Sequence, residues 1–241
     1  MQEVLTEKEM HRIALQARLP VTTFVTPLAK NNFAIRWFTQ TFEVNLCGHG
    51  SMAATYWLYK ETDHKTIYFQ SKSGPLITRI TPNEEIVMDF PAQVTTSCEA
   101  TKKKDIEDVL GIKVKKCLFG YEDYLVELES SEVVVEFKPD FSRIEKIDCR
   151  GIIITSWDSH FGFDCVSRFF CPRVGIKEDQ VCVSAHCKIL PYWQQEKGKK
   201  ILHAWQASQN GGELFLQSIA NQQRVQIRGS ARQSEKVIID L

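Results

Sequence analysis

Two short segments of the chain combine side chains that could move a proton. The first is Cys47-Gly48-His49-Gly50-Ser51, and the second is Cys182-Val183-Ser184-Ala185-His186. Each stands at the start of a predicted helix, where unpaired backbone N–H groups and the positive end of the helix dipole favour anions. A helix start also lowers the pKa of a thiol. These residues therefore indicate chemistry on a small molecule that carries a carboxylate.

The two segments occupy equivalent places in a repeated order of residues. In each half an arginine and two aromatic residues come first, followed by an acidic residue, the thiol segment, a Tyr-Trp pair and a polar turn. The first copy comprises Arg36-Trp37-Phe38, Glu43, Tyr56-Trp57 and residues 71–74, and the second comprises Arg168-Phe169-Phe170, Glu178-Asp179, Tyr192-Trp193 and residues 208–211. Such a duplication predicts two similar lobes about a pseudo-twofold axis, with two helix N-termini facing each other across a cleft.

The elements that must position these residues are predicted from capping and periodicity. Thr6 and Glu9 form a capping box ahead of apolar residues at helical spacing, which predicts a helix over residues 6–18. Segments rich in β-branched and aromatic residues predict strands at 21–25, 33–38, 66–69, 76–81 and 85–90. Residues 51–60 predict a helix that buries an apolar face made of Met52, Ala53, Tyr56 and Trp57.

The second half of the chain shows similar patterns. Helices are predicted near residues 104–110 and after Ser184, and strands at 114–119, 124–128, 133–137, 151–155, 163–170, 201–207, 213–219, 224–227 and 236–241. A polar stretch at 93–101 marks the boundary between the lobes. We expect an N-terminal lobe of residues 1–94, joined by residues 232–241, and a C-terminal lobe of residues 95–231.

Composition argues against several classes of function. The 30 basic and 30 acidic side chains balance, and charge clusters are short, so nucleic-acid binding gains no support. No apolar run approaches the roughly 20 residues of a membrane span, so a soluble, cytoplasmic protein is expected. The eight cysteines form no C-x-x-C pair and no zinc-site spacing with histidine. We expect reduced thiols, most of them buried as small hydrophobic side chains.

Four stretches of the chain resemble the phenazine biosynthesis isomerase-like (PhzF-like) family, including its eukaryotic phenazine biosynthesis-like domain proteins. They are Arg36-Trp37-Phe38-Thr39 with Glu43-Val44-Asn45-Leu46-Cys47-Gly48-His49, Gly175-Ile176-Lys177-Glu178-Asp179, Ser184-Ala185-His186-Cys187 with Pro191-Tyr192-Trp193, and Ser208 with Gly211-Gly212-Glu213-Leu214. The resemblance implies a diaminopimelate epimerase-like fold of class α/β (α+β). Its two similar lobes would each wrap a curved, mostly antiparallel or mixed sheet around a central helix, with the active site between the lobes. It also implies a homodimer.

The same resemblance implies isomerase chemistry without a cofactor or metal. The family's characterised isomerase moves a proton on a dihydro-hydroxyanthranilate, using an acid/base glutamate assisted by a histidine, an aspartate and a serine. His49, Asp179 and Ser184 match the last three by motif. The candidate substrate-binding residues are Gly48, Gly50, Ser51, Ala185, Gly211 and Gly212.

The acid/base glutamate has no match in this chain. In the family it belongs to a segment of the type N-L-S-E-[ST]-[TA]-F, which here is Arg18-Leu19-Pro20-Val21-Thr22-Thr23-Phe24, with Val21 at the acid/base position. An isopropyl group cannot carry a proton, and a general base contributes typically ~100- to 10,000-fold. Val183 also replaces a tight-turn glycine of the family, and the sequence lacks the opening strand that precedes the first helix in relatives.

These departures leave three hypotheses about function. The first is an impaired isomerase or epimerase that transfers a proton on a small carboxylate. The second is a catalytically degenerate homologue that binds a ligand or a protein without turnover. The third uses Cys47 and Cys182 as paired acid and base, as in proline racemase and diaminopimelate epimerase, against a buried structural role for both thiols. The expected partners are a small anionic metabolite and a second copy of the chain, without nucleic acid or membrane.

Several candidate residues also have a structural interpretation. Glu43 could replace the missing base, or it could serve the structure as its counterpart in the family is expected to. Ser208 with Gly211-Gly212 could form an anion-binding nest of backbone N–H groups or a plain turn. Ser184 is expected as the N-cap of its helix, and His186 as a packing or capping residue. His49 could equally cap its helix, and Asp179 could be a turn residue.

Overall fold

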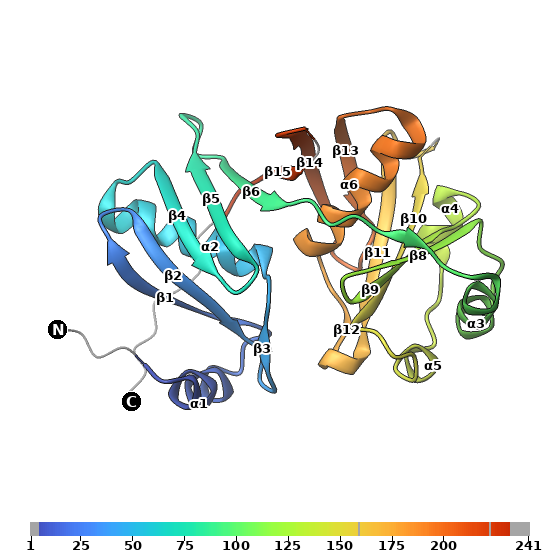
Figure 1. Cartoon of the computed structure of the whole chain (residues 1–241), viewed down its shortest axis with the longest axis horizontal. Coiled ribbons are helices and arrows are strands. Elements are labelled where there is room, and N and C mark those ends of the chain that lie inside the picture. Colours follow the sequence, from blue (N-terminus) through green and yellow to red (C-terminus); the bar gives the residue numbers. More distant parts are fainter. Residues whose placement is uncertain (1–4, 159, 222, 232–241) are drawn as a thin grey trace. The chain divides into compact units, whose positions relative to one another are not determined.

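The computed structural model describes residues 5–158, 160–221 and 223–231 (Figure 1). The chain divides into two compact units, Met1–Phe90 with Ile227–Leu241, and Pro91–Gln226. The first boundary therefore falls a few residues before the predicted one. The strand predicted at residues 236–241, which would return to the first lobe, lies outside the described residues.

The first unit combines a mixed sheet with two helices. Its elements are α1 (Glu7–Ala17), β1 (Thr22–Ala29), β2 (Asn32–Phe38), β3 (Glu43–Val44), α2 (Gly48–Thr62), β4 (Thr66–Ser71), β5 (Gly74–Ile80) and β6 (Ile86–Pro91). The strand order is β1-β2-β4-β5-β6, with β3 paired to β2. All these pairs are antiparallel except β2 with β4. Helix α2 contacts β1 and β5.

The capping box predicted at the start of the first helix is confirmed. The Glu9 backbone N–H donates to Thr6 Oγ1, and the Thr6 backbone N–H donates to Glu9 Oε2 at 2.7 Å. Two of the four unpaired N–H groups at the helix start are thereby satisfied locally. Met10 and Ala14, four residues apart, pack on Phe38 of β2. Local sequence thus fixes both where α1 begins and which side it buries.

Helix α2 buries a different side from the one predicted. Ser51, Ala54, Thr55 and Leu58 are buried, whereas Trp57 is 50% exposed and Ala53 is exposed. The buried hydroxyls are satisfied within the unit, because Thr55 Oγ1 donates to the Ser51 carbonyl at 2.7 Å and lies 2.9 Å from Thr78 Oγ1 of β5. The prediction was wrong because it followed the spacing of the large apolar residues. The helix instead packs closely against the sheet through its small residues.

The second unit holds the larger set of strands. Its elements are β7 (Thr96–Ser97), α3 (Ala100–Leu110), β8 (Lys116–Gly120), β9 (Asp123–Glu127), α4 (Ser131–Glu136), α5 (Phe141–Ile144), β10 (Gly151–Trp157), β11 (Cys165–Cys171), the 3₁₀ helix η1 (Pro172–Val174), β12 (Ile176–Glu178), α6 (Val183–Lys197), β13 (Ile201–Gln206) and β14 (Gly212–Ile219). The strand order is β14-β13-β11-β10-β9-β8-β7, with β12 paired to β11. Strand β15 (Arg224–Gly229) begins in this unit and ends in the first.

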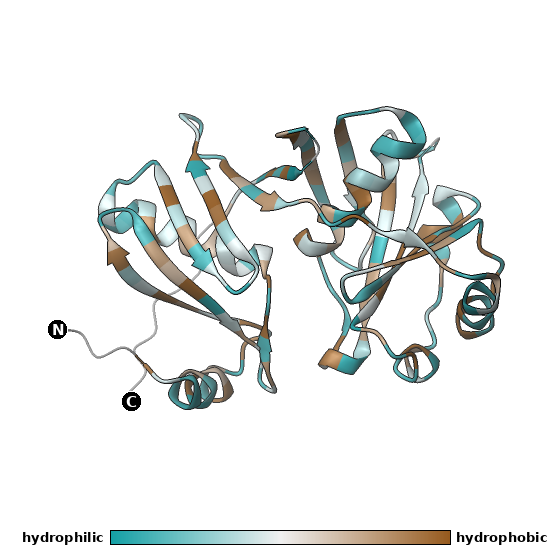
Figure 2. Ribbon diagram, viewed as in Figure 1, coloured by the Kyte–Doolittle hydropathy of each residue, from teal (hydrophilic) through white to brown (hydrophobic). Residues whose placement is uncertain are grey.

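Apolar strands form the core of the second unit. Ile152, Ile153 and Ile154 of β10 are fully buried, because β10 lies between β9 and β11 and also contacts α4 and α6. Figure 2 shows hydrophobic residues along these strands and mostly hydrophilic residues on α3. A strand covered on both faces is expected to carry consecutive apolar residues, as β10 does at Ile152–Ile154.

One predicted strand is a helix. Residues 133–137, predicted as a strand from their valines, belong mainly to α4 (Ser131–Glu136). Ser130 is its N-cap, with Ser130 Oγ accepting from the Val133 backbone N–H at 3.4 Å, and Val134 is buried in the core. The cap and the contacts with β10 and β11 outweigh the β preference of the three valines.

The two units share one pattern of strand pairing. In the first, β2 pairs antiparallel with β1 and β3 and parallel with β4. In the second, β11 pairs antiparallel with β10 and β12 and parallel with β13. The helices α2 and α6, each of 15 residues, follow β3 and β12 respectively, and each has a cysteine as its N-cap. Each unit thus places its cysteine-capped helix after a short strand that pairs with the strand bearing the arginine and aromatic residues of the repeated order.

Candidate functional site

In the first unit, the candidate residues gather at the start of α2. Cys47 is the N-cap, and its Sγ accepts a hydrogen bond of 3.5 Å from the Gly50 N–H. Ser51 Oγ donates to the Cys47 carbonyl at 2.7 Å. Gly48, Gly50 and Ser51 are buried, while His49, the second residue of the helix, is exposed. His49 is therefore the candidate in this segment whose side chain reaches solvent.

Gly50 sets how closely α2 approaches the sheet. A Cβ placed on Gly50 would come within 2.6 Å of Trp37 Cδ1 on β2 and would also overlap Thr23 Oγ1 on β1. The first turn of α2 therefore lies directly on β1. Val21, which the sequence resemblance predicts at the acid/base position, is half-buried and directly precedes β1. The backbone around Val21 thus leads into the strand against which the helix start packs.

Glu43 serves the structure of this unit. Its carboxylate accepts from Arg36 Nε and Nη2, both at 2.7 Å, and from Lys72 Nζ. The hydrogen bonds from Arg36 lower the pKa of the Glu43 carboxyl, since they favour its charged form. A carboxylate held by two cations is a poor general base, so the geometry favours the structural interpretation of Glu43.

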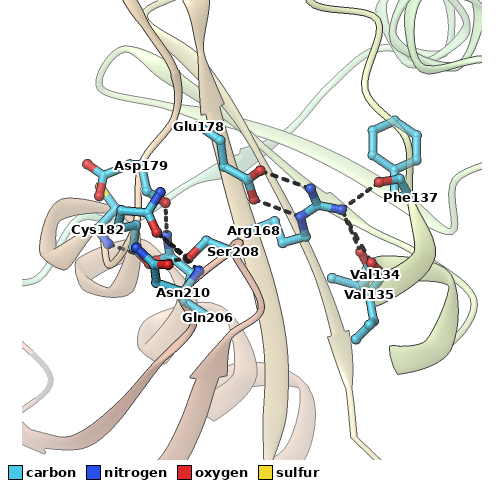
Figure 3. A network of polar contacts seen from close by, with 11 residues as sticks. Val134, Val135, Phe137, Arg168, Glu178, Asp179, Cys182, Gln206, Ser208 and Asn210 are labelled. Carbon is cyan, nitrogen blue, oxygen red and sulfur yellow. Dashed lines mark hydrogen bonds and ion pairs between the residues drawn. The ribbon is translucent and has the colours of Figure 1, made fainter.

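An equivalent ion pair lies in the second unit (Figure 3). Arg168 donates from Nε to Glu178 Oε1 at 2.7 Å and from Nη2 to Glu178 Oε2 at 2.9 Å. Its Nη1 donates to the carbonyls at the end of α4, the shortest bond being 2.5 Å to Phe137. Arg168 therefore satisfies carbonyls that the helix itself leaves unpaired and ties α4 to β11 and β12.

Gln206 fixes the loop that leads into α6. This fully buried residue of β13 accepts from the Cys182 backbone N–H at 2.7 Å and donates to the Asp179 carbonyl at 2.6 Å (Figure 3). The Asp179 carboxylate accepts from the Val181 N–H at 3.0 Å, which is the turn interaction considered for Asp179. Gln206 carries no signal in the sequence, because its partners lie more than twenty residues away.

The N-cap of α6 lies two residues before the predicted one. Cys182, in the extended region at φ −91° and ψ 103°, is the N-cap, and Ser184 is the second residue of the helix. Ser184 Oγ lies 3.2 Å from Cys182 Sγ and accepts from Arg150 Nη2 at 3.1 Å. Ser184 caps no backbone here, because its hydroxyl contacts side chains. Val183, which replaces the family's glycine, is the buried first residue of the helix.

Burial decides the state of the thiols. All eight cysteines are thiols outside any disulfide, and six of them are buried, as the sequence predicts. Burial raises the pKa of the Cys182 thiol to about 12, with the nearby Asp179 carboxylate acting in the same direction. Desolvation therefore outweighs the helix start, which alone would lower this pKa. Cys182 is a neutral thiol near pH 7.

His186 is part of the core, as predicted. It is fully buried, its Nδ1–H donates to the Cys182 carbonyl at 2.7 Å, and its Nε2 lies 3.4 Å from Ser167 Oγ. Burial lowers the pKa of the imidazole to about 4, because the charged form would lose its hydration. His186 is neutral near pH 7 and locks the first turn of α6 to β11.

Backbone N–H groups of the turn at residues 208–212 donate hydrogen bonds within the second unit. The Gly211 N–H donates to the Ser208 carbonyl at 3.0 Å, and the Asn210 N–H donates to Gln180 Oε1 at 3.3 Å. Ser208 Oγ donates to the Gln180 carbonyl at 2.6 Å. Gly211 has φ +64°, and a Cβ at Gly212 would overlap Val181. The contacts favour a turn packed on the loop before α6 over a nest for an anion.

Three charged residues near the start of α6 were not among the predicted site residues. They are Asp123, Arg150 and Lys188, which meet next to Ser184. A lysine four residues after Ser184, in a helix that is otherwise apolar on this side, was the signal that could have identified one of them. The other two lie outside every motif of the chain.

The chain matches known proteins over almost its full length. The PhzC-PhzF family model, described as phenazine biosynthesis-like protein, matches residues 1–236. An uncharacterized isomerase of Halalkalibacterium halodurans is 38% identical over 211 residues, covering 86% of this chain and 78% of the relative. An uncharacterized isomerase of Pseudomonas aeruginosa is 38% identical over 230 residues, covering 94% of this chain and 85% of the relative.

The fold matches as well. The crystal structure of a PhzF-family phenazine biosynthesis protein from Enterococcus faecalis has a TM-score of 0.83 and 32% identity, covering 96% of this chain and 87% of that chain. The expected mixed α/β class is thereby confirmed. Among the helices in the described part of the chain, none is long and apolar enough to cross a membrane.

Proposed function

The chain belongs to the PhzC-PhzF family of phenazine biosynthesis-like proteins, and we propose that it binds a small carboxylate-bearing metabolite on which it transfers a proton slowly, without a cofactor. Membership of this family supports the general class of isomerase, since relatives at 38% identity are named isomerases. The specific proposal concerns rate: Val21 removes the family's acid/base group, while the other polar side chains of the motif remain.

The observation that carries this proposal is the position of Val21 two residues before Thr23, the strand residue against which the start of α2 packs. Val21 directly precedes β1, and β1 contacts the first turn of α2 through Thr23 and Gly50. The same turn presents the exposed His49. Replacing one side chain therefore removes the proton carrier without altering the glycine packing that holds the turn. Loss of a general base reduces a rate typically ~100- to 10,000-fold.

We assign roles to the remaining residues within this proposal. His49 assists proton transfer from the start of α2. Asp179 shapes the loop before α6 through its bond to the Val181 N–H, and Ser184 offers a hydroxyl that Arg150 already orients. The ligand is a small anionic metabolite, because helix starts and cationic side chains both favour negative charge.

The experiment is restoration of the missing base. Val21→Glu and the native chain would be incubated in heavy water with the dihydro-hydroxyanthranilate of the characterised family isomerase, and deuterium incorporation would be followed by NMR. We expect Val21→Glu to exceed the native rate by at least ~100-fold. Leu28→Glu, which adds a carboxylate at an exposed position of β1, is the matched control and should leave the rate unchanged.

The alternative of ligand binding without turnover predicts another result. If Val21→Glu folds normally and still exchanges no deuterium, the proposed isomerase activity is wrong and a binding role is favoured. The two-thiol racemase hypothesis is less well supported, because burial raises the pKa of Cys182 to about 12. That hypothesis would require deuterium exchange at the Cα carbon of an amino or imino acid that Cys182→Ser abolishes.

A further inference from the structure

Four residues of the second unit form a charged cluster next to the start of α6. They are Asp123 of β9, Arg150 immediately before β10, and Ser184 and Lys188 of α6, and we refer to them as the Asp123 cluster. Arg150 Nε donates to Asp123 Oδ1 at 2.8 Å and its Nη2 contacts Asp123 Oδ2, while Lys188 Nζ lies 2.8 Å from the same Oδ2. Two cations therefore share one carboxylate.

The three charged side chains of the cluster sum to one positive charge, and two of the three are buried. Asp123 is fully buried, and Lys188 is only 2% exposed. The Gln93 Oε1 atom accepts from Lys188 Nζ, but an amide adds no negative charge. Buried charge without a counter-charge is costly, because the protein interior replaces little of the hydration that the ion loses. An anion bound at the cluster would remove this cost.

Arg150 is the part of the cluster that a ligand can reach. Its side chain is 23% exposed, and its guanidinium lies 5.0 Å from the centre of the Phe169 ring, a cation–π contact. The Nε and Nη2 edge binds Asp123, and Nη2 also donates to Ser184 Oγ at 3.1 Å. Nη1 makes no hydrogen bond to any of the described residues. The two N–H groups of Nη1 therefore remain, on a guanidinium whose Nη2 already contacts the Ser184 hydroxyl.

We propose that Arg150 and Ser184 bind the carboxylate group of the ligand, with Asp123 and Lys188 holding Arg150 in place. The chemistry of the pair selects the ligand class. An Nη1–H of Arg150 and the Ser184 O–H can each donate to one oxygen of a carboxylate, and the one excess positive charge of the cluster is balanced by a monoanion, whereas a phosphate dianion would leave a negative charge in excess. The proposal rests on the proposed function only for the size of the ligand.

The test measures binding and therefore does not depend on turnover. The native full chain would be treated with phenylglyoxal, which modifies accessible arginines, alone and with anthranilate, anthranilamide or inorganic phosphate, followed by peptide mass mapping. We expect anthranilate to slow modification of Arg150, and the uncharged anthranilamide and phosphate to have little effect. Arg173, which is 42% exposed and pairs with Asp148, is the internal control and should react equally in all samples.

A variant pair gives an independent measurement. Anthranilate should raise the melting temperature of the native chain and of Arg173→Gln in a saturable manner, and this shift should be lost in Arg150→Gln. If Arg150→Gln does not fold, the phenylglyoxal experiment on the native chain decides alone. The proposal is overturned if Arg150 does not react without ligand, if anthranilate gives no protection, or if anthranilamide or phosphate protects equally.

The two proposals can fail separately. Protection of Arg150 together with an inactive Val21→Glu variant would retain the carboxylate site and reject the isomerase activity. An active Val21→Glu variant with unprotected Arg150 would do the reverse.

Discussion

The buried imidazole of His186 should make the stability of the second unit depend on pH. His186 is fully buried, and burial lowers the pKa of its imidazole from 6.5 to about 4 in the folded chain. The unfolded chain binds a proton below pH 6.5, while the folded chain does so only near pH 4. Folding stability should therefore fall as the pH drops through this window and should level off below it.

The magnitude follows from the shift. One pKa unit corresponds to about 1.4 kcal/mol, so the full difference is roughly 3 kcal/mol. Between pH 7 and pH 5 the expected loss is about 2 kcal/mol, because the unfolded state is already mostly protonated at pH 5. Carboxylates contribute little in this interval, since their ordinary pKa values lie below it.

The measurement is urea unfolding at a series of pH values between 7 and 5. His186→Asn keeps a donor toward the Cys182 carbonyl but does not titrate, so its stability should be lower at pH 7 and should change less with pH. His160→Asn, at a side chain that is 67% exposed, is the matched control and should keep the slope of the native chain. An unchanged slope in His186→Asn would refute the reasoning.

Three further predictions concern packing and reactivity. Gly50→Ala should destabilise the first unit by about 1–3 kcal/mol in thermal unfolding, because its Cβ would overlap Trp37 and Thr23. Ala53→Ser, on the exposed side of α2, is the control and should leave the melting temperature nearly unchanged. Arg168→Met should lower the free energy of unfolding by about 3 kcal/mol, because it leaves Glu178 and the end of α4 unpaired. In urea unfolding, the double variant with Glu178→Gln should recover part of this loss. A double variant no more stable than Arg168→Met would contradict the prediction. Iodoacetamide should alkylate Cys182 slowly at pH 8 in the native chain, since a thiol with a pKa of about 12 is only about one ten-thousandth thiolate, and rapid labelling would show that the thiol is open and activated.

The family, the main strands and the first helix could be predicted from local sequence. Thr6 and Glu9 lie three residues apart, so the capping box that starts α1 is encoded within a single turn. The motif around Cys47 and the motif around Ser184 likewise place two helix starts. The absence of a proton carrier at Val21 is also a property of the sequence, because no fold can make an isopropyl group an acid or a base.

Partners that are distant along the chain could not be predicted in this way. Arg150 meets Asp123 across 27 residues and Ser184 across 34, so nothing local marks these three as neighbours. The side of α2 that is buried, and the helix in place of a strand at Ser131–Glu136, were decided by what packs against each segment.

The sequence by itself therefore determined the family, the helix starts and the presence of a valine, which carries no proton, at position 21, because each depends on residue identity and short spacing. The tertiary structure alone decided that Cys182 and His186 are neutral and that Arg150 stands beside Ser184. Those properties depend on desolvation and on the meeting of distant strands, which arise only when the chain is folded.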